Sequence, residues 1–263
     1  QHYPRAVDAA LSTPALALHA MTRVLHVLDH SLPLHSGYTF RTRAILKAQE
    51  AHGLEVRGIT GQRHNLEADI SDVREEADGL IFHRTPGTPS GPPLVRELGE
   101  IEALTAAILE VAEDWRPDII HAHSPALCGA AAQRAAAALG VPFVYEIRAF
   151  WEDAAVDHGS CEEGDLRYRL TRALETYVVK HADAITTICQ GLKQDLVERG
   201  IDSEKITVIA NAVDPSQFSR ISEKNLQLQL QLKLKNKRVL GFLGSFYGYE
   251  GLDLLIKALK QIR

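Results

Sequence analysis

The stretch AITTICQGLKQDLVERGIDSEKITVIANAVD, residues 184–214, decides the fold class of this chain. It opens with a β-branched run, AITTI, of the kind found in buried parallel strands. Leu192, Leu196 and Val197 then repeat at helical spacing, and Gly200 stands where a helix C-cap belongs. The run ITVIA predicts a second buried strand, and a polar turn, NAVD, follows it. Because open α/β sheets bind ligands at the carboxyl ends of strands, this turn is either part of a site or an ordinary connection.

Similar alternation extends along most of the chain. Predicted strands cover residues 24–28, 56–60, 80–83, 119–122, 143–147, 184–188 and 206–209. Predicted helices cover residues 39–51, 95–115, 126–139, 165–181 and 192–199. A Pro- and Gly-rich stretch, TPGTPSGPP, predicts an exposed irregular loop over residues 85–93. The pattern therefore predicts an α/β fold with a mostly parallel sheet covered by helices on both faces.

Composition narrows the function classes. The 263 residues are 45% hydrophobic and 24% charged, a normal globular balance. Lys and Arg (29) against Asp and Glu (34) give a net charge of −5, which argues against nucleic acid as a partner but leaves room for a local basic patch that contacts anionic lipid. Cys128, Cys161 and Cys189 form no CxxC pair, and no apolar run approaches a membrane span. These features predict a protein of a reduced, cytoplasmic compartment.

Both ends of the chain differ from its middle. Met21 is the sole methionine and stands just before the first predicted strand, so residues 1–20 are expected to be a tail, disordered or loosely attached. A secretory signal is the less favoured alternative, because its basic region would be Arg5 alone and Pro14 interrupts the apolar part.

The C-terminal part predicts a linker and then a new domain. Residues 224–235 alternate apolar and polar side chains like a strand, but their Leu, Gln and Lys content favours a helix within a linker over residues 215–237. A buried strand over residues 238–243 and a helix over residues 252–262 then predict the start of a second domain, residues 238–263.

Two segments after predicted strands contain candidate site residues. Gly37 lies in a turn between the first strand and first helix, where backbone N–H groups could approach a ligand, although a turn of this kind needs a glycine in any case. His121 and His123 lie on one side of a strand. Such a pair can bind zinc, but no third ligand at useful spacing follows, so no metal is expected. A histidine at the tip of the strand, available to a sugar or a proton, is the better functional interpretation.

The segment YEIRAFWED concentrates charge where a buried strand would reach the surface. A buried strand rarely carries residues such as Glu146 and Arg148 unless they are paired or functional. Arg148 suits an anionic group such as phosphate, and Trp151 beside carboxylates suits a carbohydrate. The alternative is an internal Glu146–Arg148 pair that closes the sheet edge. A later turn, residues 244–251, could cradle a phosphate at a helix N-terminus, although it lacks the ending of a Walker loop.

In chain order, PLHSGYTFRT, HAHSP, PFVYEIRAFW, ITTICQGL, ITVIANAVD and GFLGSFYGYEGLDLLIKAL resemble glycosyltransferase family 4. Members are retaining enzymes of GT-B architecture, with two facing Rossmann-like domains. The chain is most similar to the bacterial exopolysaccharide enzymes that accompany exosortase systems. The resemblance runs from about Met21 to the C-terminus and implies an acceptor-binding domain over residues 21–214. It also implies a nucleotide-sugar-binding domain that begins at residue 238 and is truncated.

The resemblance also implies roles for individual residues. The implied catalytic residues are Arg148 and His123; the acceptor-binding residues are Gly37, Tyr38, Trp151 and Asp153; the donor-binding residues are Asn211, Gly244, Ser245 and Glu250. Ser245 and Glu250 stand where the family usually has basic residues, which puts their contact with a diphosphate in doubt. The Glu-x7-Glu donor motif of the family lies beyond Arg263. The family needs no metal and no cofactor, since the nucleotide-sugar is a substrate.

The expected function follows from this resemblance. The complete enzyme would transfer a sugar from a nucleotide-sugar to a lipid-linked or polysaccharide acceptor with retention, in the cytoplasm or in peripheral contact with the inner membrane. This chain alone is expected to be inactive. The alternatives are a non-catalytic module that binds a glycan or phosphate, and an enzyme similar to the non-hydrolysing nucleotide-sugar epimerases.

Overall fold

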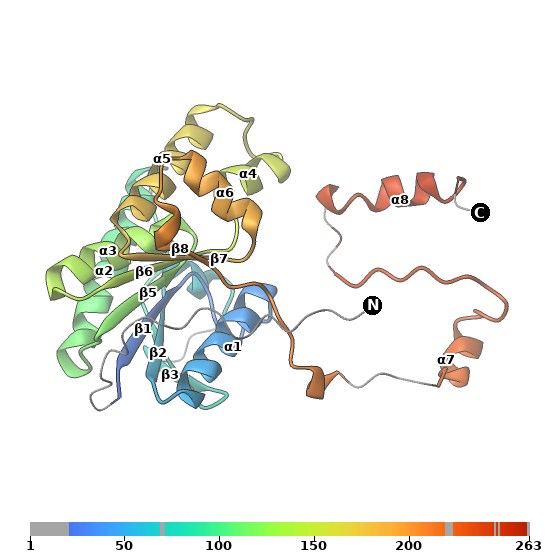
Figure 1. The fold of residues 1–263 in the computed structure, drawn as a ribbon, viewed down its shortest axis with the longest axis horizontal. Helices are drawn as coiled ribbons and strands as arrows, with labels where there is room; N and C mark the ends of the chain where they lie inside the picture. The colour runs from blue at the N-terminus through green and yellow to red at the C-terminus, as the bar shows by residue number, and fades with distance from the viewer. Residues whose placement is uncertain (1–20, 69–71, 219–222, 245, 247, 262–263) are drawn as a thin grey trace. The chain divides into compact units, whose positions relative to one another are not determined.

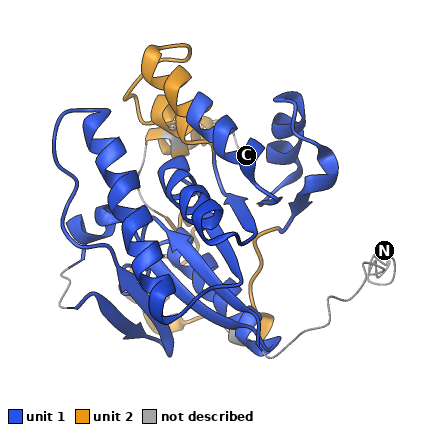
Figure 2. Ribbon diagram, turned by 90° about the vertical axis from the view of Figure 1, so that its left-hand side faces the viewer, with its two compact units in different colours: residues 1–149, 173–209 blue, residues 150–172, 210–263 orange. Residues whose placement is uncertain are grey.

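The computed structural model describes residues 21–68, 72–218, 223–244, 246 and 248–261. The tail expected over residues 1–20 and the donor-site candidate Ser245 lie outside the described residues. The chain divides into two compact units, shown in separate colours in Figure 2. The first unit comprises residues 1–149 and 173–209, and the second comprises residues 150–172 and 210–263. The domain boundaries expected from the sequence stay predictions.

The first unit is built on one mostly parallel sheet, as the sequence predicts. The described strands are β1 (Arg23–Leu28), β2 (Glu55–Thr60), β3 (Arg74–Ala77), β4 (Leu80–Arg84), β5 (Ile119–His123), β6 (Phe143–Ile147), β7 (Ala184–Thr187) and β8 (Ile206–Val208). Their order is β3-β4-β2-β1-β5-β6-β7-β8, and β3 is antiparallel to its neighbour β4 (Figure 1). The seven strands predicted between residues 24 and 209 are all present. The sequence pattern misses β3 because its residues, REEA, contain no apolar run.

Helices cover both faces of this sheet. The longer helices are α1 (Gly37–Ala51), α2 (Val95–Asp114), α3 (Ala126–Leu139), α5 (Leu166–His181) and α6 (Gln190–Glu198). On one face, Leu46 of α1 joins a buried apolar cluster with Val24 and Leu28 of β1. On the other face, α3 approaches β6 closely, since a Cβ at Gly129 would lie 2.7 Å from the Tyr145 ring. The predicted cap after α6 is confirmed, because Gly200 has a φ of +87°.

Short 3-10 turns occur in both units. They are η1 (Gln62–Leu66), η2 (Ser203–Lys205), η3 (Pro215–Gln217) and η4 (Gly248–Glu250).

The second unit contains the short helices α4 (Trp151–Asp157), α7 (Leu226–Gln231) and α8 (Leu252–Ala258). The helix preferred over residues 224–235 is confirmed as α7, which is shorter than expected. The strand predicted over residues 238–243 is wrong: these residues carry no strand assignment, and Leu243 is fully exposed. Apolar residues form a buried strand only when neighbouring strands pair with them, and no described residue pairs here. Within the described residues, no helix is both long and apolar enough to cross a membrane.

Candidate functional site

Three histidines lie side by side on the central strands of the first unit. His26 comes from β1, while His121 and His123 come from β5, and His26 is the direct strand partner of His121. His26 and His123 are fully buried, and His121 is 7% exposed. Because residues two apart in a strand point to the same face, all three rings lie on the face that α1 covers. Buried histidines in such a group need partners for their ring nitrogens.

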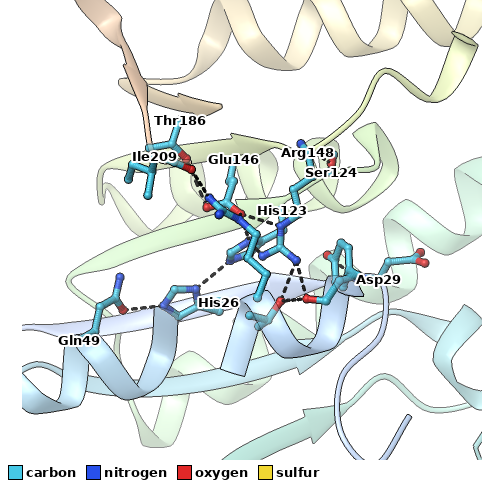
Figure 3. A network of polar contacts seen from close by, with 12 residues as sticks. His26, Asp29, Gln49, His123, Ser124, Glu146, Arg148, Thr186 and Ile209 are labelled. Carbon is cyan, nitrogen blue, oxygen red and sulfur yellow. Dashed lines mark hydrogen bonds and ion pairs between the residues drawn. The ribbon is translucent and has the colours of Figure 1, made fainter. Parts of the chain in front are cut away.

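His26 and His123 belong to one chain of hydrogen bonds, drawn in Figure 3. His26 Nδ1 lies 2.9 Å from His123 Nε2, and His26 Nε2 lies 2.7 Å from Gln49 Oε1. On the other side, Nη2 of Arg148 lies 2.6 Å from His123 Nδ1. A guanidinium can only donate, so His123 accepts at Nδ1 and donates from Nε2 to His26, which in turn donates to Gln49. The network thus assigns a tautomer to each imidazole.

Burial keeps these imidazoles neutral. It lowers the pKa of each of His26, His121 and His123 to about 3, and the charge of Arg148 acts in the same direction. Above about pH 5 all three rings are therefore uncharged, available as hydrogen-bond acceptors or as metal ligands.

Glu146 is the carboxylate at the centre of the network. It is fully buried, and its Oε1 accepts from Arg148 Nε at 2.6 Å and from Arg41 Nε at 3.0 Å. Burial acts to raise the pKa of Glu146, but the neighbouring Arg148 guanidinium opposes it, and that pKa lies well below its usual range. Two guanidinium groups thus share one buried anion at the end of β6.

Arg148 connects this carboxylate to the first turns of α1. Its Nη1 donates to the Tyr38 carbonyl at 2.7 Å and to Thr42 Oγ1 at 2.9 Å, and its guanidinium carbon lies 4.2 Å from the centre of the Tyr38 ring. Only 9% of the Arg148 side chain is exposed. The internal Glu146–Arg148 pair, weighed above as an alternative to a functional arginine, is therefore present. The catalytic assignment of Arg148 and His123 stays a prediction.

Arg41 and His26 are members of the network that the sequence analysis did not select. Arg41 Nη2 donates to the carbonyl of Ile209 at 2.7 Å, which ties α1 to the chain just after β8. A basic residue one turn after Tyr38 was the available signal for Arg41. For His26, the signal was a histidine within the otherwise apolar run RVLHVL.

The structure brings some of the predicted site residues together. Tyr38, His123 and Arg148 all belong to the network, and Gly37 precedes Tyr38 as the exposed first residue of α1. Tyr38 Oη also accepts from the backbone N–H of Asp29 at 3.1 Å.

The other predicted site residues belong to the second unit. Trp151 is 38% exposed, and the carboxylate of Asp153 accepts from Tyr168 Oη at 2.9 Å. The donor-site candidates Asn211, Gly244 and Glu250 are exposed residues of the same unit. Their binding roles stay predictions.

The family of this chain follows from comparison with known sequences. Residues 36–212 match the family described as the glycosyl transferase 4-like domain, a span that includes α1, β5, β6 and every member of the polar network that lies on them, but not His26 of β1. The chain belongs to this family. The resemblance to glycosyltransferase family 4 is thereby confirmed at the level of the family.

Individual relatives agree with this membership. The chain is 25% identical over 228 residues to the putative colanic acid biosynthesis glycosyl transferase WcaI of Escherichia coli K12, covering 81% of this chain and 56% of that protein. It is 21% identical over 126 residues to the probable glycosyltransferase WbjE of Pseudomonas aeruginosa, covering 48% of this chain and 32% of that protein. The chain thus spans about half the length of the first relative and about a third of the second.

Solved structures share the fold. Sucrose-phosphate synthase from Thermosynechococcus elongatus matches with a TM-score of 0.67 and 15% identity, over 92% of this chain and 60% of that one. Anabaena Alr3699/HepE in complex with UDP-glucose matches with a TM-score of 0.61 and 16% identity, over 91% of this chain and 57% of that one. At such identities the likeness shows the fold alone.

Proposed function

We propose that this chain contributes the acceptor-binding part of a retaining glycosyltransferase that uses a nucleotide-sugar donor. The observation that supports this most strongly is the family match over residues 36–212, which contains every strand of the sheet except β1, together with Tyr38, His123, Glu146 and Arg148. Ligands of α/β sheets bind at this edge, so the predicted acceptor residues Gly37 and Tyr38 are in a suitable place. The acceptor in this proposal is lipid-linked or a polysaccharide, in line with the colanic acid relative.

Within the proposal, Arg148 and His123 act by positioning the acceptor side of the site. The donors of Arg148 are directed at Glu146, His123, Thr42 and the Tyr38 carbonyl, so the guanidinium holds the first turn of α1. Gly37 precedes that turn and has open space around it, since a Cβ there would meet no atom within 4 Å. A substrate group could therefore approach the backbone of Gly37, the residue next to Tyr38.

The donor side of the reaction is proposed to work by electrostatics. In such a transfer the nucleoside diphosphate leaves with negative charge, which backbone N–H groups and positive charge stabilise in a site that excludes water. Asn211, Gly244, Ser245 and Glu250 are the proposed donor contacts, together with residues that follow Arg263 in the complete protein. Neighbours bound to UDP-glucose support a nucleotide-sugar donor. A peripheral contact with the inner membrane also belongs to this proposal.

Titration of the purified chain tests the proposal. Calorimetry with a sugar-linked polyprenyl diphosphate analogue is expected to show saturable binding, and Tyr38→Ala is expected to weaken it about tenfold or more, the loss of one good contact. Phe40→Ala, which removes another exposed aromatic of α1, is the matched control and is expected to bind normally. Equal binding by both variants would contradict the placement of the acceptor site. Sugar transfer by the 263-residue chain at a rate abolished by an Arg148 substitution would contradict the expected inactivity of this chain.

A further inference from the structure

We propose that His26, His121 and His123 form a binding site for a divalent transition-metal ion such as zinc. The His-x-His pair of β5 lacks a third ligand nearby in the sequence, and the fold supplies one from β1, at a position 95 residues before His121. One ligand atom from each of the three side chains can be chosen so that all three atoms lie within 4.8 Å of one another. Three imidazoles are the ligand set of one class of catalytic zinc site.

His121 provides the first independent observation. Its ring stacks on His123 with centroids 4.5 Å apart, yet its buried Nε2 has no hydrogen-bond partner among the described residues. The other two rings are bonded at both nitrogens. A buried nitrogen without a partner is costly, and a metal ion would provide the missing one.

The surroundings of the other two rings provide the second observation. A metal-binding imidazole normally donates its remaining N–H to a carboxylate or carbonyl oxygen, which fixes the orientation of the ring. His26 already has Gln49 Oε1 at 2.7 Å from Nε2, and His123 has Glu146 Oε1 at 3.3 Å from Nδ1. The nitrogens that remain, His26 Nδ1 and His123 Nε2, face each other at 2.9 Å. The oxygens of Gln49 and Glu146 therefore lie beside His26 Nε2 and His123 Nδ1, and the two facing nitrogens are left to bind the ion.

The protonation state also suits a metal. Imidazole binds metal ions in its neutral form, and the directions of the hydrogen bonds make His26 and His123 neutral, each with one nitrogen that accepts. Nitrogen ligands of this type select zinc, copper, nickel or iron over magnesium and calcium.

Metal binding would rearrange one contact of the network. The proton of His123 would move from Nε2 to Nδ1, which lies 3.3 Å from Glu146 Oε1. Arg148 Nη2, a donor 2.6 Å from the same nitrogen, would then have to move away from it. Arg148 would retain its bonds to Glu146, Thr42 and the Tyr38 carbonyl. The carboxylate of Glu146 offsets part of the repulsion between the ion and the guanidinium groups of Arg41 and Arg148.

The experiment is a metal titration of the purified chain after treatment with a chelator. Co²⁺ is added first, because the strength of its visible absorption distinguishes a four- or five-coordinate protein site from the free aqua ion, and Zn²⁺ is then added to displace it. We expect one tight equivalent per chain, and an increase in Tm with Zn²⁺ because the ion binds the folded state. His121→Gln is expected to lose this equivalent. His52→Gln, which changes an exposed histidine, is the matched control and is expected to keep it.

The second variant is Gln49→Ala, which removes the oxygen bonded to His26. It is expected to bind Co²⁺ about 10-fold to 100-fold more weakly, the usual effect of removing such a supporting group. If circular dichroism shows that His121→Gln is unfolded, the affinity of Gln49→Ala for Co²⁺ becomes the deciding measurement. Absence of a tight equivalent would overturn the proposal. Equal affinity in the wild type and in a folded His121→Gln or Gln49→Ala variant would also overturn it, because it would show binding to surface histidines only. No nucleotide or acceptor is present, so the result is independent of the proposed function.

Discussion

At the scale of the single residue, Glu146 supplies the negative charge that the two arginines of the network share. One carboxylate with 1% of its side chain exposed accepts from two guanidinium groups, and both of these are largely shielded from water. Water therefore cannot replace the carboxylate if its charge is removed. The stability of the first unit should depend on this one charge more than on any surface ion pair.

We predict that Glu146→Gln lowers the free energy of unfolding by about 3 kcal/mol, because it leaves Arg41 and Arg148 without their buried anion. Urea denaturation measures this loss. The matched control is Glu50→Gln, which breaks the exposed Lys47–Glu50 pair and should change the free energy by no more than about 0.5 kcal/mol. Equal losses in the two variants would show that the buried charge contributes no more than a surface one.

The histidine cluster predicts a pH dependence with a definite sign. In the folded chain the pKa of His26, His121 and His123 is about 3, against an ordinary value of 6.5. The unfolded chain therefore binds more protons between these values, so stability is complete above about pH 6.5 and falls as the pH drops towards 3. Each histidine contributes a loss of about 2 kcal/mol between pH 7 and pH 5.

Urea denaturation at pH 7 and pH 5, in the presence of a chelator, measures this dependence. A variant with His121→Gln should show a smaller loss between the two pH values than the wild type. An unfolding free energy that is the same at both pH values would mean that the rings take up protons in the folded chain as readily as in the unfolded chain.

At the scale of the element, the approach of α3 to β6 depends on one glycine. A Cβ at Gly129 would lie 2.5 Å from Val178 Cγ1 and 2.7 Å from the Tyr145 ring, both in fully buried surroundings. We predict that Gly129→Ala destabilises the chain by about 1–3 kcal/mol, because the helix must move away from the sheet.

Gly99 in α2 provides the matched control. It is also a helical glycine, but it is exposed and a Cβ there would meet nothing within 4 Å. Gly99→Ala should stabilise the chain by up to about 1 kcal/mol, since alanine is the better helix former. Thermal denaturation of the two variants should show shifts of opposite sign, and shifts of the same sign would contradict the packing of α3 described above.

The elements also show how far sequence reasoning reaches. Strands such as β1, β5 and β6 are predictable because long-range burial leaves a local mark, a short run of apolar residues. The strand β3 contains no apolar run, whereas residues 238–243 contain one and form no strand. Apolar composition reports a tendency to be buried, while strand formation also needs a pairing partner.

The site shows the same limit in its side chains. Tyr38, His123 and Arg148 are recognisable because each follows or ends a predicted strand beside an unusual polar motif. His26 is not recognisable as their partner, because its contact with His123 spans 97 residues and depends on the pairing of β1 with β5. The saturation of Arg148 by Glu146, His123 and α1 is equally invisible in the sequence. Spacing along the chain predicts which residues are candidates, and the sheet order decides which of them meet.

At the scale of the whole molecule, the chain has two units, and the family match is concentrated on the part that contains the sheet. The matched region makes up 56% of the first curated relative and 32% of the second. The activity proposed here is therefore proposed for a protein of the relatives' full length.

The most direct test of the central claim is a transfer assay on the full-length protein that contains this chain. It is incubated with UDP-sugars and a lipid-linked sugar acceptor, and NMR follows the anomeric configuration of the product. We predict a new glycosidic bond with the anomeric configuration of the donor, and slower transfer by the Tyr38→Ala variant. Conversion of the donor to its C2 epimer, or acceptor binding without consumption of any donor, would contradict a glycosyltransferase.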